Sequence, residues 1–153
     1  MTDFEIRYFA DDAAVRHVGE GLLARTLPKT EWTHEAHLAA CLWLLTERPD
    51  IHVERDLPAI ISGYNEAVGG VNDAIQGYHH TITLTYVAGV RDFLARSPAG
   101  MSLAAYVNAL LNAPEGQRGY PLRRYSRETL FSVGARLGYV PPDLECDAGG
   151  EGG

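Results

Sequence analysis

Apolar residues recur three or four positions apart along most of the chain, which is the spacing that gives a helix one buried face. Residues that favour helix starts, such as Thr33, Asp56 and Ser126, precede several of these runs. Proline or glycine follows most of them. The pattern predicts six helices, over residues 11–27, 33–48, 56–68, 78–95, 102–112 and 127–137. The expected fold class is all-α, a single compact bundle of about five to six helices.

The fourth run has a competing interpretation, because β-branched residues gather near its start. Thr81, Ile82 and Thr83 favour strands, so its first turn is also compatible with a short strand. The end of the chain is easier to interpret. Residues 144–153 are acidic and rich in glycine, which predicts a disordered tail after one helical domain over residues 1–143.

Length and charge narrow the classes of function. A chain of 153 residues with 46% hydrophobic and 22% charged residues fits one globular domain with a sizeable core. Twenty acidic residues oppose 13 basic ones, giving a net charge of −7, so nucleic acid is not an expected partner. The longest apolar run, residues 38–45, is far too short to span a membrane, so no membrane partner is expected either.

The cysteines and the first residues predict a location. Cys41 and Cys146 form no disulfide framework, which indicates a reducing compartment. Residues 1–7 are acidic and polar, unlike a signal peptide. The cytoplasm is therefore expected. Lys29 is the only lysine among many arginines, which indicates a bacterial source with a GC-rich genome.

Two of the six histidines lie three residues apart at the start of the second predicted helix. His34 and His37 share a face that continues to Cys41 in the core. Such a pair is either a set of satisfied core polar groups or a pair of ligands. The helix start favours the neutral imidazole that metal binding or proton acceptance requires. In the alternative interpretation Trp32 packs on His37, and both imidazoles bond to backbone carbonyls.

A second histidine segment, residues 77–83, offers a third nitrogen ligand. His79 shares a helical face with Ile82 and Tyr86, whereas His80 lies about 100° further round the helix. His79 is therefore the preferred third ligand. The predicted metal site has His34, His37 and His79 converging on a divalent transition metal, with zinc, iron, nickel and copper equally compatible.

Polar residues between and after these segments are candidates for further roles. Glu66 is a candidate fourth ligand or general base, and Asn65 and Asn72 are candidates to orient an imidazole or to bind substrate. These residues are also ordinary turn formers beside a glycine helix stop. Tyr78 and Arg136 are candidate substrate-binding residues, and the catalytic candidates besides Glu66 are His80 and Tyr125. Arginines near residues 123–136 suit an anionic substrate, or simply balance the acidic surface.

Four ordered motifs also carry a resemblance to a known family. They are Trp32-Thr33-His34-x-Ala36-His37-Leu38, Tyr64-Asn65-x-Ala67-x-Gly69, Gly77-Tyr78-His79-x-Thr81-Ile82-Thr83 and the stretch from Pro121 to Arg136. Together they span about residues 30–144 and resemble a family of small bacterial proteins without an assigned activity. The resemblance implies no reaction. Relatives often carry glutamate at the position of His80, which leaves the role of that position open.

Three classes of function remain in competition. The first is a metal-dependent enzyme that acts on a small polar molecule, with Glu66 or His80 as fourth ligand or base. The second uses the same histidines as acid and base without metal. The third is a helical small-molecule binding or interaction module, with a homodimer as its candidate assembly. A glycine-rich nucleotide loop and a Cys-x-x-Cys pair are both missing from the sequence, so no other cofactor is indicated.

Overall fold

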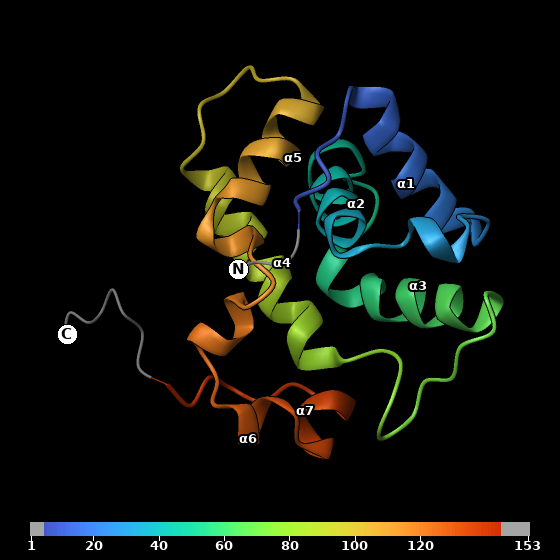
Figure 1. Ribbon diagram of the computed structural model, residues 1–153, viewed down its shortest axis with the longest axis vertical. Helices are drawn as coiled ribbons and strands as arrows, with labels where there is room; N and C mark the ends of the chain where they lie inside the picture. The colour runs from blue at the N-terminus through green and yellow to red at the C-terminus, as the bar shows by residue number, and fades with distance from the viewer. Residues whose placement is uncertain (1–4, 145–153) are drawn as a thin grey trace.

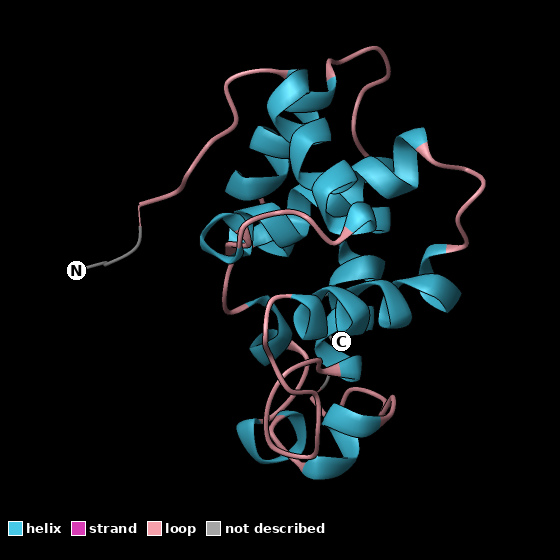
Figure 2. Ribbon diagram, turned by 90° about the vertical axis from the view of Figure 1, so that its right-hand side faces the viewer, coloured by secondary structure: helices cyan, strands magenta, loops and turns pink. Residues whose placement is uncertain are grey.

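The computed structural model describes residues 5–144, and every regular element in that part of the chain is a helix (Figure 2). The all-α prediction is therefore confirmed. The predicted disordered tail, apart from Leu144, lies outside the described residues. None of the helices in residues 5–144 is long and apolar enough to cross a membrane.

The chain forms seven α-helices within the described residues, with one short 3-10 turn between α1 and α2 and two between α5 and α6. Figure 1 shows how the helices are arranged. The helices are α1 (Asp12–Ala24), α2 (His34–Glu47), α3 (Val53–Ala67), α4 (His80–Ala95), α5 (Leu103–Asn112), α6 (Arg127–Leu130) and α7 (Val133–Leu137). The 3-10 turns are Lys29–Glu31, Pro114–Gly116 and Tyr120–Arg123.

Helix α2 is the centre of the fold. It contacts α1, α3, α4 and α5, and its side chains from residue 38 to residue 44 are all buried. A helix that is apolar all round can lie only in such a position. Leu38, Leu42 and Trp43 join α2 to the main core. Gly19 lets α1 approach closely, because a Cβ at that position would collide with the ring of Trp43. The C-terminal half of α2 therefore packs closely against α1.

The predicted starts of α2 and α5 are confirmed by their caps. The Thr33 hydroxyl accepts a hydrogen bond from the Ala36 amide at 3.1 Å, and the Ser102 hydroxyl accepts one from the Ala105 amide at 3.1 Å. Each bond satisfies an amide that the helix itself leaves without a partner.

Helix α3 begins three residues before the predicted start at Asp56. His52 is its N-cap, with Nδ1 accepting from the Arg55 amide at 3.3 Å. The Asp56 carboxylate bonds back to the His52 amide at 3.0 Å, so Asp56 supports the cap from inside the helix. A histidine is a rare cap, which is why residue preference pointed to Asp56 instead.

The predicted sixth helix over residues 127–137 is divided into α6 and α7. Ser132 causes the division, because its hydroxyl accepts from the Ala135 amide at 3.2 Å and starts a new helix. The strand alternative for the start of the fourth run is wrong. Thr81 and Thr85 fit within α4 since their hydroxyls donate to the carbonyls of Gly138 and Thr81, at 2.8 and 2.7 Å.

Candidate functional site

A cavity of about 360 Å³ lies between α2, α3 and α4, and we call it the histidine cavity. Its size suits a small organic molecule. Aliphatic side chains form most of the wall, namely Leu38, Leu57, Ile61, Ile82 and Val87. The remaining lining residues are His34, His37, Cys41, Thr83 and Tyr86. The lining of the cavity is thus mostly apolar, with a few polar groups on α2 and α4.

His37 presents a fixed tautomer to this cavity. Its Nδ1 lies 2.7 Å from the Thr33 carbonyl oxygen, which can only accept, so Nδ1 carries the proton. Nε2 is then the acceptor, and no group in the described residues forms a hydrogen bond with it. Trp32 stacks on the ring with centroids 3.8 Å apart. The predicted packing of Trp32 on His37 and the predicted carbonyl bond are both present. They fix the orientation of the ring and leave Nε2 without a hydrogen bond from the described residues.

The environment of His37 keeps its imidazole neutral. His37 is exposed to solvent, while Trp32 covers one face of its ring. Desolvation by the surrounding protein is the main cause that lowers the pKa of His37 to about 4, against the opposing effect of the Thr33 bond. At neutral pH the ring therefore accepts hydrogen bonds and carries no charge.

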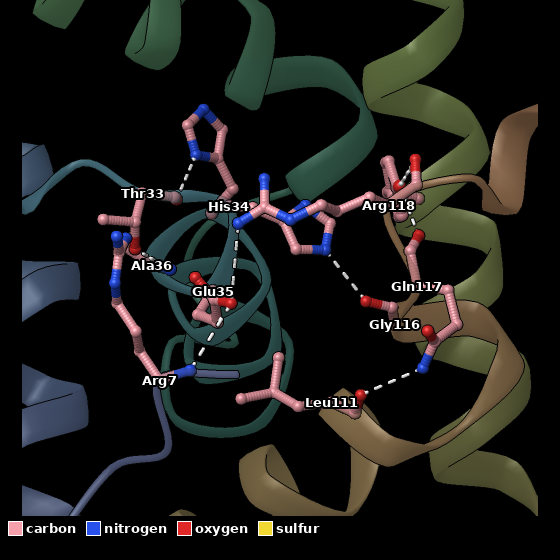
Figure 3. A network of polar contacts seen from close by, with 11 residues as sticks. Arg7, Thr33, His34, Glu35, Ala36, Leu111, Gly116, Gln117 and Arg118 are labelled. Carbon is pink, nitrogen blue, oxygen red and sulfur yellow. Dashed lines mark hydrogen bonds and ion pairs between the residues drawn. The ribbon is translucent and has the colours of Figure 1, made fainter. Parts of the chain in front are cut away.

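His34 is the second imidazole of the histidine cavity and is arranged in the opposite sense. Its Nε2 donates to the Gly116 carbonyl at 2.9 Å (Figure 3), which leaves Nδ1 as the acceptor. The ring is half-buried and stands edge-on to Tyr86 at 5.8 Å. Burial lowers the pKa of His34 as well, with the Gly116 bond opposing it. Both cavity histidines are therefore neutral, and each donates one ring N–H to a backbone carbonyl and keeps the other nitrogen as an acceptor.

The other polar groups of the cavity are either protonated or already hydrogen-bonded to backbone carbonyls. Burial raises the pKa of the Cys41 thiol to about 12, so it stays protonated and is a poor nucleophile. The Tyr86 hydroxyl donates to the Gln117 carbonyl at 2.7 Å, and burial raises its pKa too. Thr83 donates to the His79 carbonyl at 2.9 Å. His34 and His37 remain as the reactive groups.

His79 does not join the pair, contrary to the predicted convergence. It is the N-cap of α4, with Nδ1 accepting from the Ile82 amide at 3.1 Å and Nε2 donating to the Leu130 carbonyl at 2.7 Å. Both nitrogens are occupied, and His79 is not among the residues that line the histidine cavity. Residues 5–144 contain no group of three or more His, Cys, Asp or Glu side chains that could hold a metal. The helix begins at His80, so the ring of His79 turns back to cap it.

Asn65, Glu66 and Asn72 are brought together, but at the end of α3 rather than at the cavity. The Asn72 side chain accepts from the Tyr78 amide at 2.9 Å and from Asn65 at 3.1 Å. It also donates to the Ser62 carbonyl at 3.0 Å and to Glu66 at 3.3 Å. These bonds hold the loop between α3 and α4, as the turn-former interpretation predicts.

The remaining candidates also have partners outside the cavity. The Tyr78 hydroxyl and His80 Nδ1 lie 2.9 Å apart and bond to each other. Arg136 donates to the Gly77 carbonyl at 2.8 Å and so ties α7 to the start of α4. Tyr125 is buried and donates to the Val140 carbonyl at 2.6 Å. None of these four residues lines the histidine cavity.

The sequence did not single out the residues that shape the cavity opposite the histidines. Leu57, Ile61 and Val87 have the apolar spacing of ordinary core residues, so no local signal marks them as cavity walls. Tyr86 was visible only as a neighbour of His79 on a helical face. A void is a property of how three helices meet, and residue spacing within each helix does not reveal it.

Fold and site together define an all-helical protein with an apolar cavity that presents two neutral imidazoles. Comparisons of the chain with protein-family models, with curated proteins and with solved structures found no match. The resemblance of the four motifs to small bacterial proteins therefore stays a prediction.

Proposed function

We propose that the protein binds a small, mostly apolar molecule that carries a hydrogen-bond donor. The observation that supports this most directly is the fixed tautomer of His37, which leaves Nε2 as an acceptor in a mostly apolar cavity. Apolar walls supply affinity, and a small number of well-placed polar groups supplies specificity. A ligand hydroxyl or amide would complete the one hydrogen bond that the protein leaves open at His37.

The pKa of His37 favours binding over acid–base catalysis. A general base works best when its pKa lies near the working pH. With a pKa of about 4, His37 is a weaker base than an ordinary histidine and takes a proton less readily at neutral pH. The same low pKa keeps the acceptor lone pair available over a wide pH range. We place this binding in the cytoplasm, on the composition and cysteine usage of the chain.

The binding proposal is tested with 4-ethylphenol and 4-ethyltoluene, which differ by one hydroxyl in place of a methyl group. Replacing His37 by phenylalanine removes the acceptor and keeps a ring against Trp32. We expect the ratio of the two affinities, phenol over toluene, to fall about tenfold in His37→Phe, as the loss of one hydrogen bond in a mostly apolar cavity implies. Isothermal titration calorimetry measures both affinities.

His17→Phe is the matched control, because His17 pairs with Glu31 on the surface away from the cavity. The affinity ratio should not change in this variant. In the wild-type protein the affinity ratio should also stay constant as the pH is lowered to about 5, where a histidine of ordinary pKa would be largely protonated. An affinity ratio that is equal in wild type and His37→Phe, or one that collapses already near pH 6.5, would contradict the proposal.

A metal-dependent enzyme acting on a small polar molecule is the second candidate. Metal-binding histidines usually donate their other N–H to a carbonyl or carboxylate, and both His34 and His37 do so. Two imidazoles would leave further coordination positions for water and substrate. Under this candidate, protein purified without a histidine tag binds one equivalent of Zn²⁺ in a calorimetric titration. His37→Phe then loses that binding and His17→Phe keeps it, whereas equal binding by both variants would dismiss the candidate.

A further inference from the structure

Glu35 is a buried carboxylate with few hydrogen-bond donors around it in the described part of the chain. Its side chain is 4% exposed, and Oε1 has no hydrogen-bond partner among the described residues. Within residues 5–144, Oε2 has two long contacts, with the Arg7 amide at 3.5 Å and with Nη2 of Arg118 at 3.7 Å (Figure 3). A carboxylate can accept about four hydrogen bonds, and buried polar groups are seldom left without them. The missing donors point to a ligand.

A second cavity, of about 290 Å³, lies beside this carboxylate, and we call it the Glu35 cavity. It opens between the start of α2 and the loop after α5, and Ile6 and Leu111 give it an apolar side. Glu35 and Arg118 both line it, so opposite charges stand next to each other on the wall. The side chain of Arg118 is 40% exposed, and its guanidinium carries five N–H donors.

We propose that the Glu35 cavity binds a small zwitterion of the amino-acid type, with its ammonium group on Glu35 and its carboxylate on Arg118. A purely cationic ligand would gain from Glu35 but meet the guanidinium of Arg118. A purely anionic ligand would meet the carboxylate. A molecule with both charges complements both side chains, and its apolar part fits against Ile6 and Leu111. This site is separate from the site of the proposed function, although His34 lines both cavities.

Three probes of one carbon skeleton test this charge matching: L-leucine, isopentylamine, which lacks the carboxylate, and 4-methylpentanoate, which lacks the ammonium group. In titrations followed by two-dimensional NMR, leucine should bind at least about tenfold more tightly than either single-charge probe, as one charge-assisted hydrogen bond implies. The amide signals of Gly116 and Gly119, which line the cavity, should shift on binding. Equal affinity for all three probes, or no saturable shift with leucine, would overturn the proposal.

Variants assign each charge to its partner. Glu35→Gln should remove the higher affinity of leucine over 4-methylpentanoate. Arg118→Gln should remove the higher affinity of leucine over isopentylamine. The surface pair Arg16 and Glu47, joined at 2.9 Å, provides the matched controls Glu47→Gln and Arg16→Gln, which should leave both advantages intact. His37→Phe should also keep leucine binding, so failure of the first proposal leaves this one standing. A leucine advantage that persists in Glu35→Gln contradicts the assignment, and the wild-type probe series decides the proposal even if a variant does not fold.

Discussion

Replacing His79 by alanine is expected to lower the free energy of unfolding by about 2–4 kcal/mol while the affinity of the histidine cavity for 4-ethylphenol stays unchanged. The loss has two sources. The Ile82 amide loses the cap that begins α4, and the buried Leu130 carbonyl loses the donor that lies 2.7 Å from it. Urea denaturation followed by circular dichroism measures the first quantity, and calorimetry below the unfolding transition measures the second.

His79→Asn separates the two sources. Asparagine is a good N-cap, so its side chain should restore the bond to the Ile82 amide. It is too short to replace the bond to Leu130. We therefore expect His79→Asn to recover about 1 kcal/mol of the loss. Should His79→Ala abolish ligand binding while leaving stability intact, His79 would belong to the site after all, and the structural role given to it here would be wrong.

Replacing Gly77 by alanine is expected to destabilise the protein by about 2–5 kcal/mol, the sum of left-handed backbone strain and a steric collision. Gly77 has φ of 83°, and a Cβ on it would collide with the Val71 carbonyl and with Asn72. These neighbours are backbone and a side chain held by four hydrogen bonds, so they have little freedom to move. Thermal and urea unfolding measure the loss.

Gly69→Ala is the matched control for this substitution. Gly69 also has a positive φ, of 92°, but no atom lies within 4 Å of a Cβ placed on it. It should therefore lose only about 1–2 kcal/mol from backbone strain. The difference between the two variants measures the collision alone. Equal losses would show that the loop after α3 yields to the added methyl group and does not hold the start of α4 in place.

The positioning of His37 differs from that of His79 because of where each lies relative to the first residue of its helix. Thr33 caps α2, so His37 sits one turn inside and projects from the helix with one nitrogen open. His79 is itself the cap of α4, so its ring bends back and both nitrogens are used locally. The position of a histidine relative to its helix cap, four residues after it for His37 and at the cap itself for His79, thus decides whether a ring nitrogen stays open.

Local sequence determined most of the helical fold and, within the candidate site, the pair His34 and His37. Apolar periodicity and caps are local properties, so they indicated all-α structure, the starts of α2 and α5, and the shared face of His34 and His37. The same reasoning did not predict helix caps formed by histidine, or a cap that lies inside a predicted helix. His52, His79 and Ser132 begin helices in the structure although residue preference favoured other positions or a continuous helix.

Tertiary structure decided the rest, because cavities and buried charges arise where separate helices meet. The walls of the histidine cavity come from α2, α3 and α4, and nothing in the spacing within one helix shows that they leave a space between them. Glu35 appears in the sequence as an ordinary acidic residue in a first helical turn. Residues 6–7 and the loop after α5 approach it in the folded chain and set Arg118 beside it, although Glu35 and Arg118 are 83 positions apart in the sequence.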